Sequence, residues 1–322
     1  MKITNDLNIP EHAFAAICRH QGRLDPPTLD YIGVTTLMGE PLPRYLKARH
    51  WAELEIKASE TMNAMQGQMG HLLFAGAQTD TETEIHLETE FEGVTIKGIA
   101  DYYDPKLFTL GDAKFKQVNA VTATNIRGYD KLETQLNIYC WMARRMGYDV
   151  QHLQGDIYIN GWTVYKAFGD SAYPKAPYVK LSIPIWEEAF TANYVSERLR
   201  VHNTRAIFLL RDFGTKLPER DEEIRLLLDS AMLKIPICTD EERFMQPTKY
   251  AVMKEGQKKA VKLCDKLEDA LLYIAAQPST ALKAKLSVTE RKGGYMRCGF
   301  YCGVRNFCVH NKKTLDNQNE VV

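Results

Sequence analysis

The chain has 322 residues, 45% of them hydrophobic, so it can bury one large core or two modest ones and does not belong to the disordered class. Its 41 basic side chains balance 41 acidic ones, so the chain as a whole has no net charge to attract a polyanion. Contacts with nucleic acid must therefore come from local basic patches. No apolar run of about 18 residues occurs, and the N-terminus lacks the pattern of a signal peptide. We therefore expect a cytoplasmic protein with no membrane contact.

The N-terminal part, residues 1–57, is expected to pack on the core of the protein. It begins with a predicted helix and a loop containing the Pro26-Pro27 break, followed by a short strand or helix start at YIGVTTLM. From about Glu53 to Ala77, apolar residues recur at helical spacing, which predicts a helix with His71 near its end. The residues expected on its buried face are Met62, Met65, Met69, Leu72 and Leu73.

The hydrophobic period then changes to that of strands. Apolar and polar residues alternate in EIHLETEF, and VTIKGIADYYD and LFTLGDAKFKQ follow across turns at Glu92-Gly93 and Asp104-Pro105. These segments predict an antiparallel meander of three strands. A helix from about Tyr129 to Met146 and another strand follow, so the order predicts an α/β fold with a mixed central sheet flanked by helices. The inner face of that helix should carry Leu132, Leu136, Tyr139 or Cys140, and Ala143.

The last part, residues 201–322, is expected to be mainly helical. Helices are predicted from about Trp186 to Leu210, from Pro218 to Leu233 and over DKLEDALLYIAAQ, with a small hairpin at KYAVMKEGQKKAVKL. Residues 249–313 contain 14 Lys and Arg against five Asp and Glu. This excess is either a solvated face or a local patch for nucleic acid.

Two neighbouring strands of the meander carry the residues that point to chemistry. Asp101 ends GIAD on the second strand, while Asp112 and Lys114 form DAK on one face of the third. Converging carboxylates repel each other, and a hard cation such as magnesium or manganese relieves that repulsion. A lysine beside such a cation completes a site for phosphodiester hydrolysis. The D-x-K spacing alone is common on solvated strands, but Phe108 and Leu110 share the parity of Asp112 and Lys114, which indicates that this face is partly buried.

Three residues on the flanking helices extend this group. Gln135 and Tyr139 lie one helical turn apart, so that the amide and phenol could hydrogen-bond a phosphate or orient Lys114. Without a nearby site, they would be a surface amide and a core aromatic. His71 follows Gly67 and Gly70 on its helix; it is either a satisfied core histidine or a nitrogen ligand that would favour manganese.

In this order, the motifs resemble the RecB-type branch of the PD-(D/E)XK nucleases. The matching motifs are G-x-x-x-H at Gly67–His71, G-x-x-D at Gly98–Asp101, D-x-K at Asp112–Lys114 and Q-x-x-x-Y at Gln135–Tyr139. The resemblance implies a restriction-endonuclease-like core, which we place at residues 58–200. It further implies that His71, Asp101 and Asp112 bind the metal, that Lys114 serves the attacking water, and that Gln135 and Tyr139 support the lysine and the substrate.

Three of the seven cysteines lie close together near the C-terminus, in the pattern C-x3-C-x5-C at Cys298, Cys302 and Cys308. Such thiols indicate a soft-metal or iron–sulfur site, with unrelated buried cysteines as the alternative. Iron–sulfur CRISPR adaptation nucleases and helicase–nuclease subunits, which this chain resembles, hold a 4Fe-4S cluster with one N-terminal and three C-terminal cysteines. Here the usual N-terminal cysteine is missing, so Cys18 is expected as the fourth ligand. Alternatively, His310 completes a structural zinc site, or the site is degenerate.

These features favour a metal-dependent DNA nuclease, most simply an exonuclease acting on ends or single strands in recombination, repair or phage DNA metabolism, with recombination or replication proteins as partners. Beyond the core motifs, Trp141, Trp162 and Tyr165 could stack bases, and residues 249–266 could hold the backbone, but most of them are equally explained as core or surface residues. A DNA-binding or assembly subunit with a vestigial nuclease fold is the alternative, although the intact Asp101, Asp112 and Lys114 argue against it. An enzyme acting on a small phosphate ester is less favoured, because the chain has no Gly-rich phosphate loop.

Overall fold

The computed structural model describes residues 1–20, 31–76, 79–122, 125–202 and 235–311. The chain divides into two compact units, Met1–Pro236 and Ile237–Val322, each of which is described by itself. Within the described ranges, no helix combines the length and apolar character needed to span a membrane. The division of the chain into segments 1–57, 58–200 and 201–322 stays a prediction.

The first unit contains the long strands and helices. Its strands are β1 (Lys2–Thr4), β2 (Ile32–Gly33), β3 (Glu55–Lys57), β4 (Glu82–Phe91), β5 (Val94–Asp104), β6 (Thr109–Gln117), β7 (His152–Asn160) and β8 (Tyr178–Ile183). Its helices are α1 (Glu11–His20), α2 (Val34–Met38), α3 (Pro41–Arg49), α4 (Ala58–Ala75), α5 (Tyr129–Arg145), α6 (Val164–Gly169) and α7 (Glu188–Val201), with 3-10 turns at Trp51–Glu53 and Val118–Ala120.

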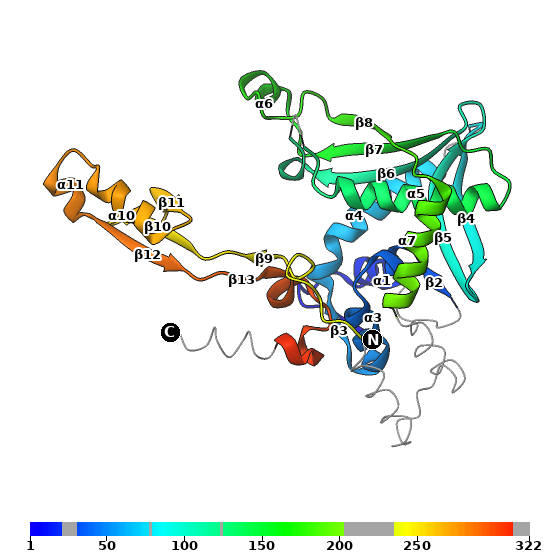
Figure 1. Cartoon of the computed structure of the whole chain (residues 1–322), viewed down its shortest axis with the longest axis horizontal. Helices are drawn as coiled ribbons and strands as arrows, with labels where there is room; N and C mark the ends of the chain where they lie inside the picture. Colours follow the sequence, from blue (N-terminus) through cyan, green and yellow to red (C-terminus); the bar gives the residue numbers. More distant parts are fainter. Residues whose placement is uncertain (21–30, 77–78, 123–124, 203–234, 312–322) are drawn as a thin grey trace, which may run out of the picture. The chain divides into compact units, whose positions relative to one another are not determined.

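Six strands of this unit form one mixed sheet in the order β2-β5-β6-β7-β8, with β4 paired to β5 (Figure 1). Strands β4, β5 and β6 are the antiparallel meander that the sequence predicts. Strands β6 and β7 are parallel, as a crossover through α5 requires. The expected α/β class, a mixed central sheet flanked by helices, is therefore confirmed.

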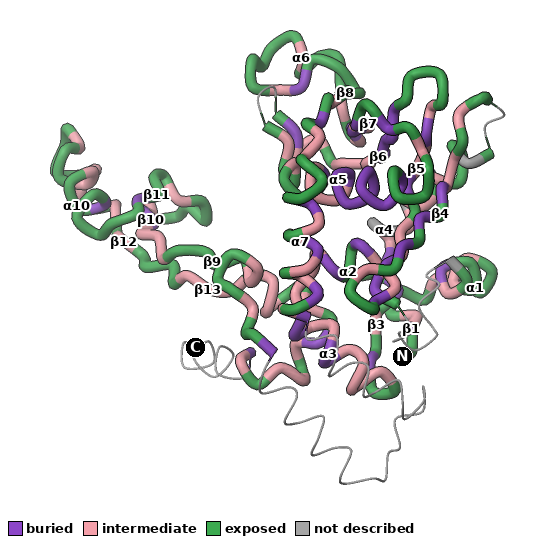
Figure 2. Tube along the Cα trace, turned by 45° about the vertical axis from the view of Figure 1, so that its right-hand side comes forward, coloured by how far each residue is buried: buried purple, intermediate pink, exposed green. Residues whose placement is uncertain are grey.

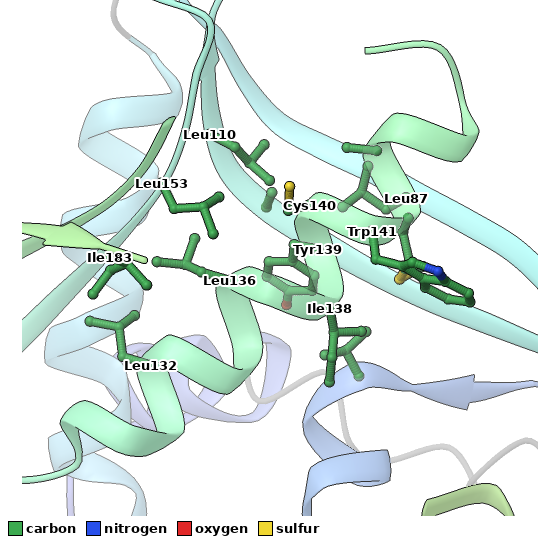
Figure 3. Close-up of a cluster of buried hydrophobic side chains, with 14 of the residues drawn as sticks. Leu87, Leu110, Leu132, Leu136, Ile138, Tyr139, Cys140, Trp141, Leu153 and Ile183 are labelled. Atoms are coloured by element: carbon green, nitrogen blue, oxygen red, sulfur yellow. The ribbon is translucent and has the colours of Figure 1, made fainter. Parts of the chain in front are cut away.

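Helix α5 packs on one face of the sheet and forms the centre of the core (Figure 3). Leu136 of α5 and Leu110 of β6 are both fully buried in this cluster. The burial continues around the helix, since Ile138 and Trp141 are also buried, and Figure 2 shows α5 largely in the colour of buried residues. The predicted inner face is confirmed: Leu132, Leu136, Tyr139, Cys140 and Ala143 are all buried.

Helix α4 packs on the opposite face of the sheet. Leu110 faces α5, and Phe115, five residues further along β6, therefore points to the opposite face of the sheet. There it contacts α4, since a Cβ on Gly70 would lie 2.0 Å from the Phe115 ring. The predicted apolar contact face of α4 is partly wrong, because Met69, Leu72 and Leu73 are 49%, 58% and 76% exposed. The helix approaches the sheet through a glycine instead of a stripe of large apolar side chains.

The N-terminal segment is held to the sheet and to α7. Strand β2 pairs in parallel with β5. The Nε atom of Arg198 on α7 donates to the carbonyl of Leu37 at 3.0 Å, and Nη2 donates to the carbonyl of Gly39. The predicted helix 186–210 is observed as α7, which ends at Val201; its later part and the predicted helix 218–233 lie outside the described residues.

The second unit contains a small antiparallel sheet, β11-β10-β12, covered by α10. The hairpin and helix that the sequence predicts here are both confirmed. Its elements are β9 (Met245–Gln246), β10 (Lys249–Lys254), β11 (Lys262–Cys264), α10 (Leu267–Ala275), α11 (Thr280–Ala284), β12 (Leu286–Arg291) and β13 (Gly294–Tyr295), with a π-helical turn at Arg297–Tyr301 and a 3-10 turn at Arg305–Phe307.

Candidate active site

Asp101 lies at a fork between strands. On one edge of β5, residues 102–104 pair with residues 109–111 of β6, whereas the N-terminal part of β5 pairs on that edge with β2. Asp101 stands between the two pairings, and its Oδ2 accepts a hydrogen bond from the N–H of Ala113 at 2.6 Å. The backbone of β6 thus fixes the carboxylate at the point where the strands part.

Glu84 and His71 add two ligand atoms at this fork. Glu84 has φ of 52°, a value that strand residues avoid, and the regular β4–β5 pairing is interrupted at this residue. His71 of α4 places its Nδ1 atom 3.4 Å from Oδ1 of Asp101. One ligand atom each from His71, Glu84 and Asp101 lies within 4.8 Å of the other two.

The sequence analysis did not single out Glu84. In EIHLETEF, the alternation makes Glu84 one of several acidic residues expected on the solvated side of a regular strand. The left-handed backbone at Glu84 breaks that regularity and turns the carboxylate toward the fork. A single left-handed residue within a strand leaves no mark in the hydrophobic period, although an acidic residue directly opposite Asp101 in a hairpin is a usable signal.

The donor set of this group suits a divalent metal ion. Burial raises the pKa of the Asp101 carboxyl, and the charge of Glu84 adds to that effect, while the Ala113 N–H, His71 and Lys114 oppose it. A bound cation would relieve the repulsion between the carboxylates, and two oxygen ligands with one imidazole nitrogen fit magnesium or manganese. Within the described part of the chain, no other group of His, Cys, Asp or Glu meets this spacing.

Asp112 and Lys114 form an ion pair beside the metal group. Oδ2 of Asp112 lies 2.5 Å from Nζ of Lys114, and the Asp112 side chain is 1% exposed. Burial raises the pKa of Asp112 to about 6; Lys114 opposes this shift and Asp101 adds to it. The expected convergence of Asp101, Asp112 and Lys114 is therefore observed, but Asp112 points to the lysine and is not in the group with metal-ligand spacing.

Gln135 and Tyr139 approach these residues from α5. Nε2 of Gln135 donates to the phenol oxygen of Tyr139 at 3.0 Å. Burial raises the pKa of Tyr139 to about 12, so the phenol keeps its proton. Gly98 makes this approach feasible, because a Cβ at that position would lie 2.5 Å from the Tyr139 ring. Close packing against Tyr139 thus explains why the G-x-x-D motif has a glycine at position 98.

The metal group opens into a cavity of about 360 Å³. His71, Glu84 and Asp101 line one part of it, and Phe74 and Tyr158 line another. A phosphate group entering this cavity would therefore meet the metal ligands and an aromatic wall together.

The aromatic residues that the sequence suggested for base stacking lie elsewhere. Trp141 is 4% exposed and packs on Phe91 in the core, so its prediction as a stacking surface is wrong. Trp162 is half-buried and donates its indole N–H to the carbonyl of Pro174. Tyr165 is exposed on α6 but does not line the cavity at the metal group.

The three C-terminal cysteines lie in the second unit and are half-buried. Nε of Arg243 donates to Sγ of Cys298 at 3.4 Å, and burial raises the pKa of Cys302. Among the described residues, three thiols do not come within 4.8 Å of one another, as ligands of a single zinc ion at about 2.3 Å would. Cys18 belongs to the first unit, so its role as fourth ligand stays a prediction.

Comparisons with known proteins give only distant structural likenesses. No protein-family model matches the chain, and no curated protein matches it in sequence. A crystal structure of the protein SSO0001 is 17% identical, with a TM-score of 0.39 over 58% of this chain and 83% of that one. A phage-related exonuclease from Haemophilus somnus 129PT is 13% identical, with a TM-score of 0.31 over 47% and 73% of the two chains. The function is therefore argued from the side chains at the fork.

Proposed function

We propose that this protein is a metal-dependent deoxyribonuclease of the RecB-type PD-(D/E)XK class. The observation that carries the proposal is the meeting of His71, Glu84 and Asp101 at metal-ligand spacing beside the Asp112–Lys114 ion pair. A cation held there would supply Lewis-acid stabilisation of charge on the scissile phosphate. The Lys114 ammonium supplies a positive charge beside the metal group, and its N–H donors can position an attacking water.

The remaining residues hold this arrangement in place. Asp112 is buried and, apart from the ammonium of Lys114, its Oδ2 has no hydrogen-bond donor among the described residues, so it fixes the position of Lys114. The phenol oxygen of Tyr139 accepts a hydrogen bond from the Gln135 amide. The phenol also keeps its own proton, so it can donate a second hydrogen bond to a group in the site. The cavity at the metal group is lined by His71, Glu84 and Asp101, and we favour exonuclease action on DNA at these residues.

The test uses end-labelled linear single- and double-stranded DNA and closed circles, each with magnesium, manganese or a chelator. Wild-type protein should degrade linear DNA only with metal. Lys114→Ala should lower the rate at least about 100-fold, since single groups that stabilise a transition state contribute on this scale. Lys97→Ala, which removes an exposed partner of Glu88, is the matched control and should leave the rate unchanged.

Label release shows the direction of digestion, and circles show whether a free end is needed. A wild-type protein that binds manganese but cleaves none of these substrates would contradict the nuclease and favour a DNA-binding or assembly subunit acting with recombination or replication proteins. Cleavage that persists in chelator would contradict the metal site.

We also propose that Cys298, Cys302 and Cys308 hold a structural iron–sulfur cluster. Their separation argues against one shared zinc ion, whereas an iron–sulfur cluster has a different iron for each thiolate. Anaerobically purified protein should contain iron and sulfide and absorb visible light, and Cys302→Ser should lose both. Zinc in place of iron, with bound metal lost in a His310→Ala variant, would contradict the cluster.

A further inference from the structure

A row of aromatic rings crosses the sheet face that carries α4, beginning next to the metal group. Phe74 of α4 stacks on Phe115 with ring centroids 5.7 Å apart, and Phe115 stacks on Tyr158 at 5.1 Å. Tyr158 contacts Tyr178 of the edge strand β8 at 5.3 Å. His71 contacts the row at Phe115, with its ring 5.8 Å from that of Phe115. The row thus links the metal ligands to the edge of the sheet.

The outer members of this row are open to solvent. Phe74 and Tyr178 are 38% and 39% exposed, and both line the cavity at the metal group. Exposed aromatic side chains that gather along one cavity indicate a binding surface, whereas apolar side chains exposed singly do not.

Asp156, which the proposed chemistry does not use, fixes the far end of the row. Its side chain is 4% exposed and accepts hydrogen bonds from the hydroxyls of Tyr102 at 2.6 Å and Tyr178 at 2.5 Å. Gln154 adds a third donor. A buried carboxylate satisfied in this way holds the Tyr178 ring in one orientation before any ligand arrives.

Basic side chains continue the path beyond Tyr178. A second cavity, of about 980 Å³, shares Tyr178 with the first and is lined by Arg127, Lys175 and Lys180, against one acidic residue, Asp130. Lys180 lies two residues from Tyr178 on β8, on the same face of the strand. Positive charge therefore follows the aromatic row on the side away from the metal ligands.

We propose that this path binds a single-stranded DNA segment, with bases on the exposed rings of Phe74 and Tyr178 and phosphates at Arg127 and Lys180. The proposal rests on the nuclease function above and adds its substrate track. Ring faces are available only on unpaired bases, because a duplex stacks them internally. Stacking and charge do not read base edges, so binding should tolerate any sequence.

The test measures binding separately from cleavage. Fluorescence anisotropy of a labelled oligothymidylate, a mixed-sequence single strand and a matched duplex is recorded in chelator at several salt concentrations. Wild type should bind both single strands similarly and the duplex more weakly. Tyr178→Leu should weaken single-strand binding about five- to 100-fold without changing its salt dependence. Tyr178→Phe keeps the ring but loses the hydrogen bond to Asp156, so it should weaken binding less than Tyr178→Leu.

The basic variants should behave differently. Lys180→Ala and Arg127→Ala should each weaken binding to both single strands equally and lower the salt slope by about 0.7, because one phosphate contact is lost. The matched controls are Tyr165→Ala on α6 and Arg200→Ala, an exposed partner of Glu197. Both should bind as wild type.

Unchanged affinity in Tyr178→Leu and Lys180→Ala, or tighter binding of duplex than of single strands, would overturn the track. Because binding is measured in chelator, this result is independent of whether the protein cleaves DNA. Conversely, wild type could cleave no DNA while only the variants of the track lose affinity for single strands. That result would support the single-strand track and contradict the proposed nuclease function.

Discussion

Glu84 shows how one backbone conformation changes the chemistry of the site. Glu84 stands opposite Asp101 between β4 and β5, has φ of 52°, and has a carboxylate oxygen within 4.8 Å of ligand atoms of His71 and Asp101. The backbone of Glu84 is strained, and its carboxylate is repelled by the carboxylate of Asp101. Such a combination is typical of functional positions, where a ligand repays the cost.

At the residue scale, we predict that Glu84→Gln weakens manganese binding by at least about tenfold, because it replaces a charged ligand with a neutral one. Isothermal titration with manganese measures this. Glu88→Gln, on the same strand and paired with Lys97, is the control and should bind as wild type. Equal affinities in the two variants would remove Glu84 from the ligand set.

At the scale of elements, α4 and α5 approach the sheet by different means. The apolar period predicts five buried residues of α5 but misses Ile138, Trp141 and Met142, because residues 136–143 are buried on every side of the helix. The same reasoning fails for α4, where Gly70 makes the close contact and Leu72 and Leu73 face solvent. The order of motifs in the sequence indicates Asp101, Asp112 and Lys114, but the left-handed backbone at Glu84 and the aromatic row depend on three-dimensional packing that no local pattern encodes.

Two glycines of α4 provide a matched test of this packing. A Cβ on Gly67 meets nothing within 4 Å, whereas one on Gly70 would lie 2.0 Å from the Phe115 ring. Gly67→Ala should stabilise the protein by up to about 1 kcal/mol through helix propensity, and Gly70→Ala should destabilise it by about 1–3 kcal/mol through overpacking. Urea unfolding measures both, and a Gly70→Ala variant as stable as Gly67→Ala would contradict the placement of α4.

At the scale of the whole molecule, buried polar groups join segments that are far apart in the sequence. His202, at the end of α7, is 1% exposed and lies 3.0 Å from the carbonyl of Leu37 and 3.2 Å from that of Gly39 through Nε2. Its Nδ1 atom has no hydrogen-bond partner among the described residues. Burial lowers the pKa of His202 to about 4, and Arg44 and Arg198 add to the shift. The histidine therefore links the N-terminal segment to α7 in its neutral form.

This arrangement predicts a loss of stability in mild acid. The pKa is lower in the folded state than the unfolded value near 6.5, so the unfolded chain binds more protons as the pH falls from about 6.5 to 4. The contribution of neutral His202 should fall by about 2 kcal/mol between pH 7 and pH 5. Urea unfolding at both pH values should show this extra loss in wild type and not in His202→Gln; identical pH dependence would refute it.

The central claim is that the carboxylate at the fork is part of a metal-dependent hydrolytic site. The most direct measurement is the single-turnover cleavage rate of end-labelled single-stranded DNA in manganese, for wild type, Asp101→Asn and the exposed control Glu88→Gln, with circular dichroism of each variant. We predict a fall of at least about 100-fold in Asp101→Asn with its fold intact, and wild-type activity in Glu88→Gln. A folded Asp101→Asn variant that cleaves at the wild-type rate would contradict the account.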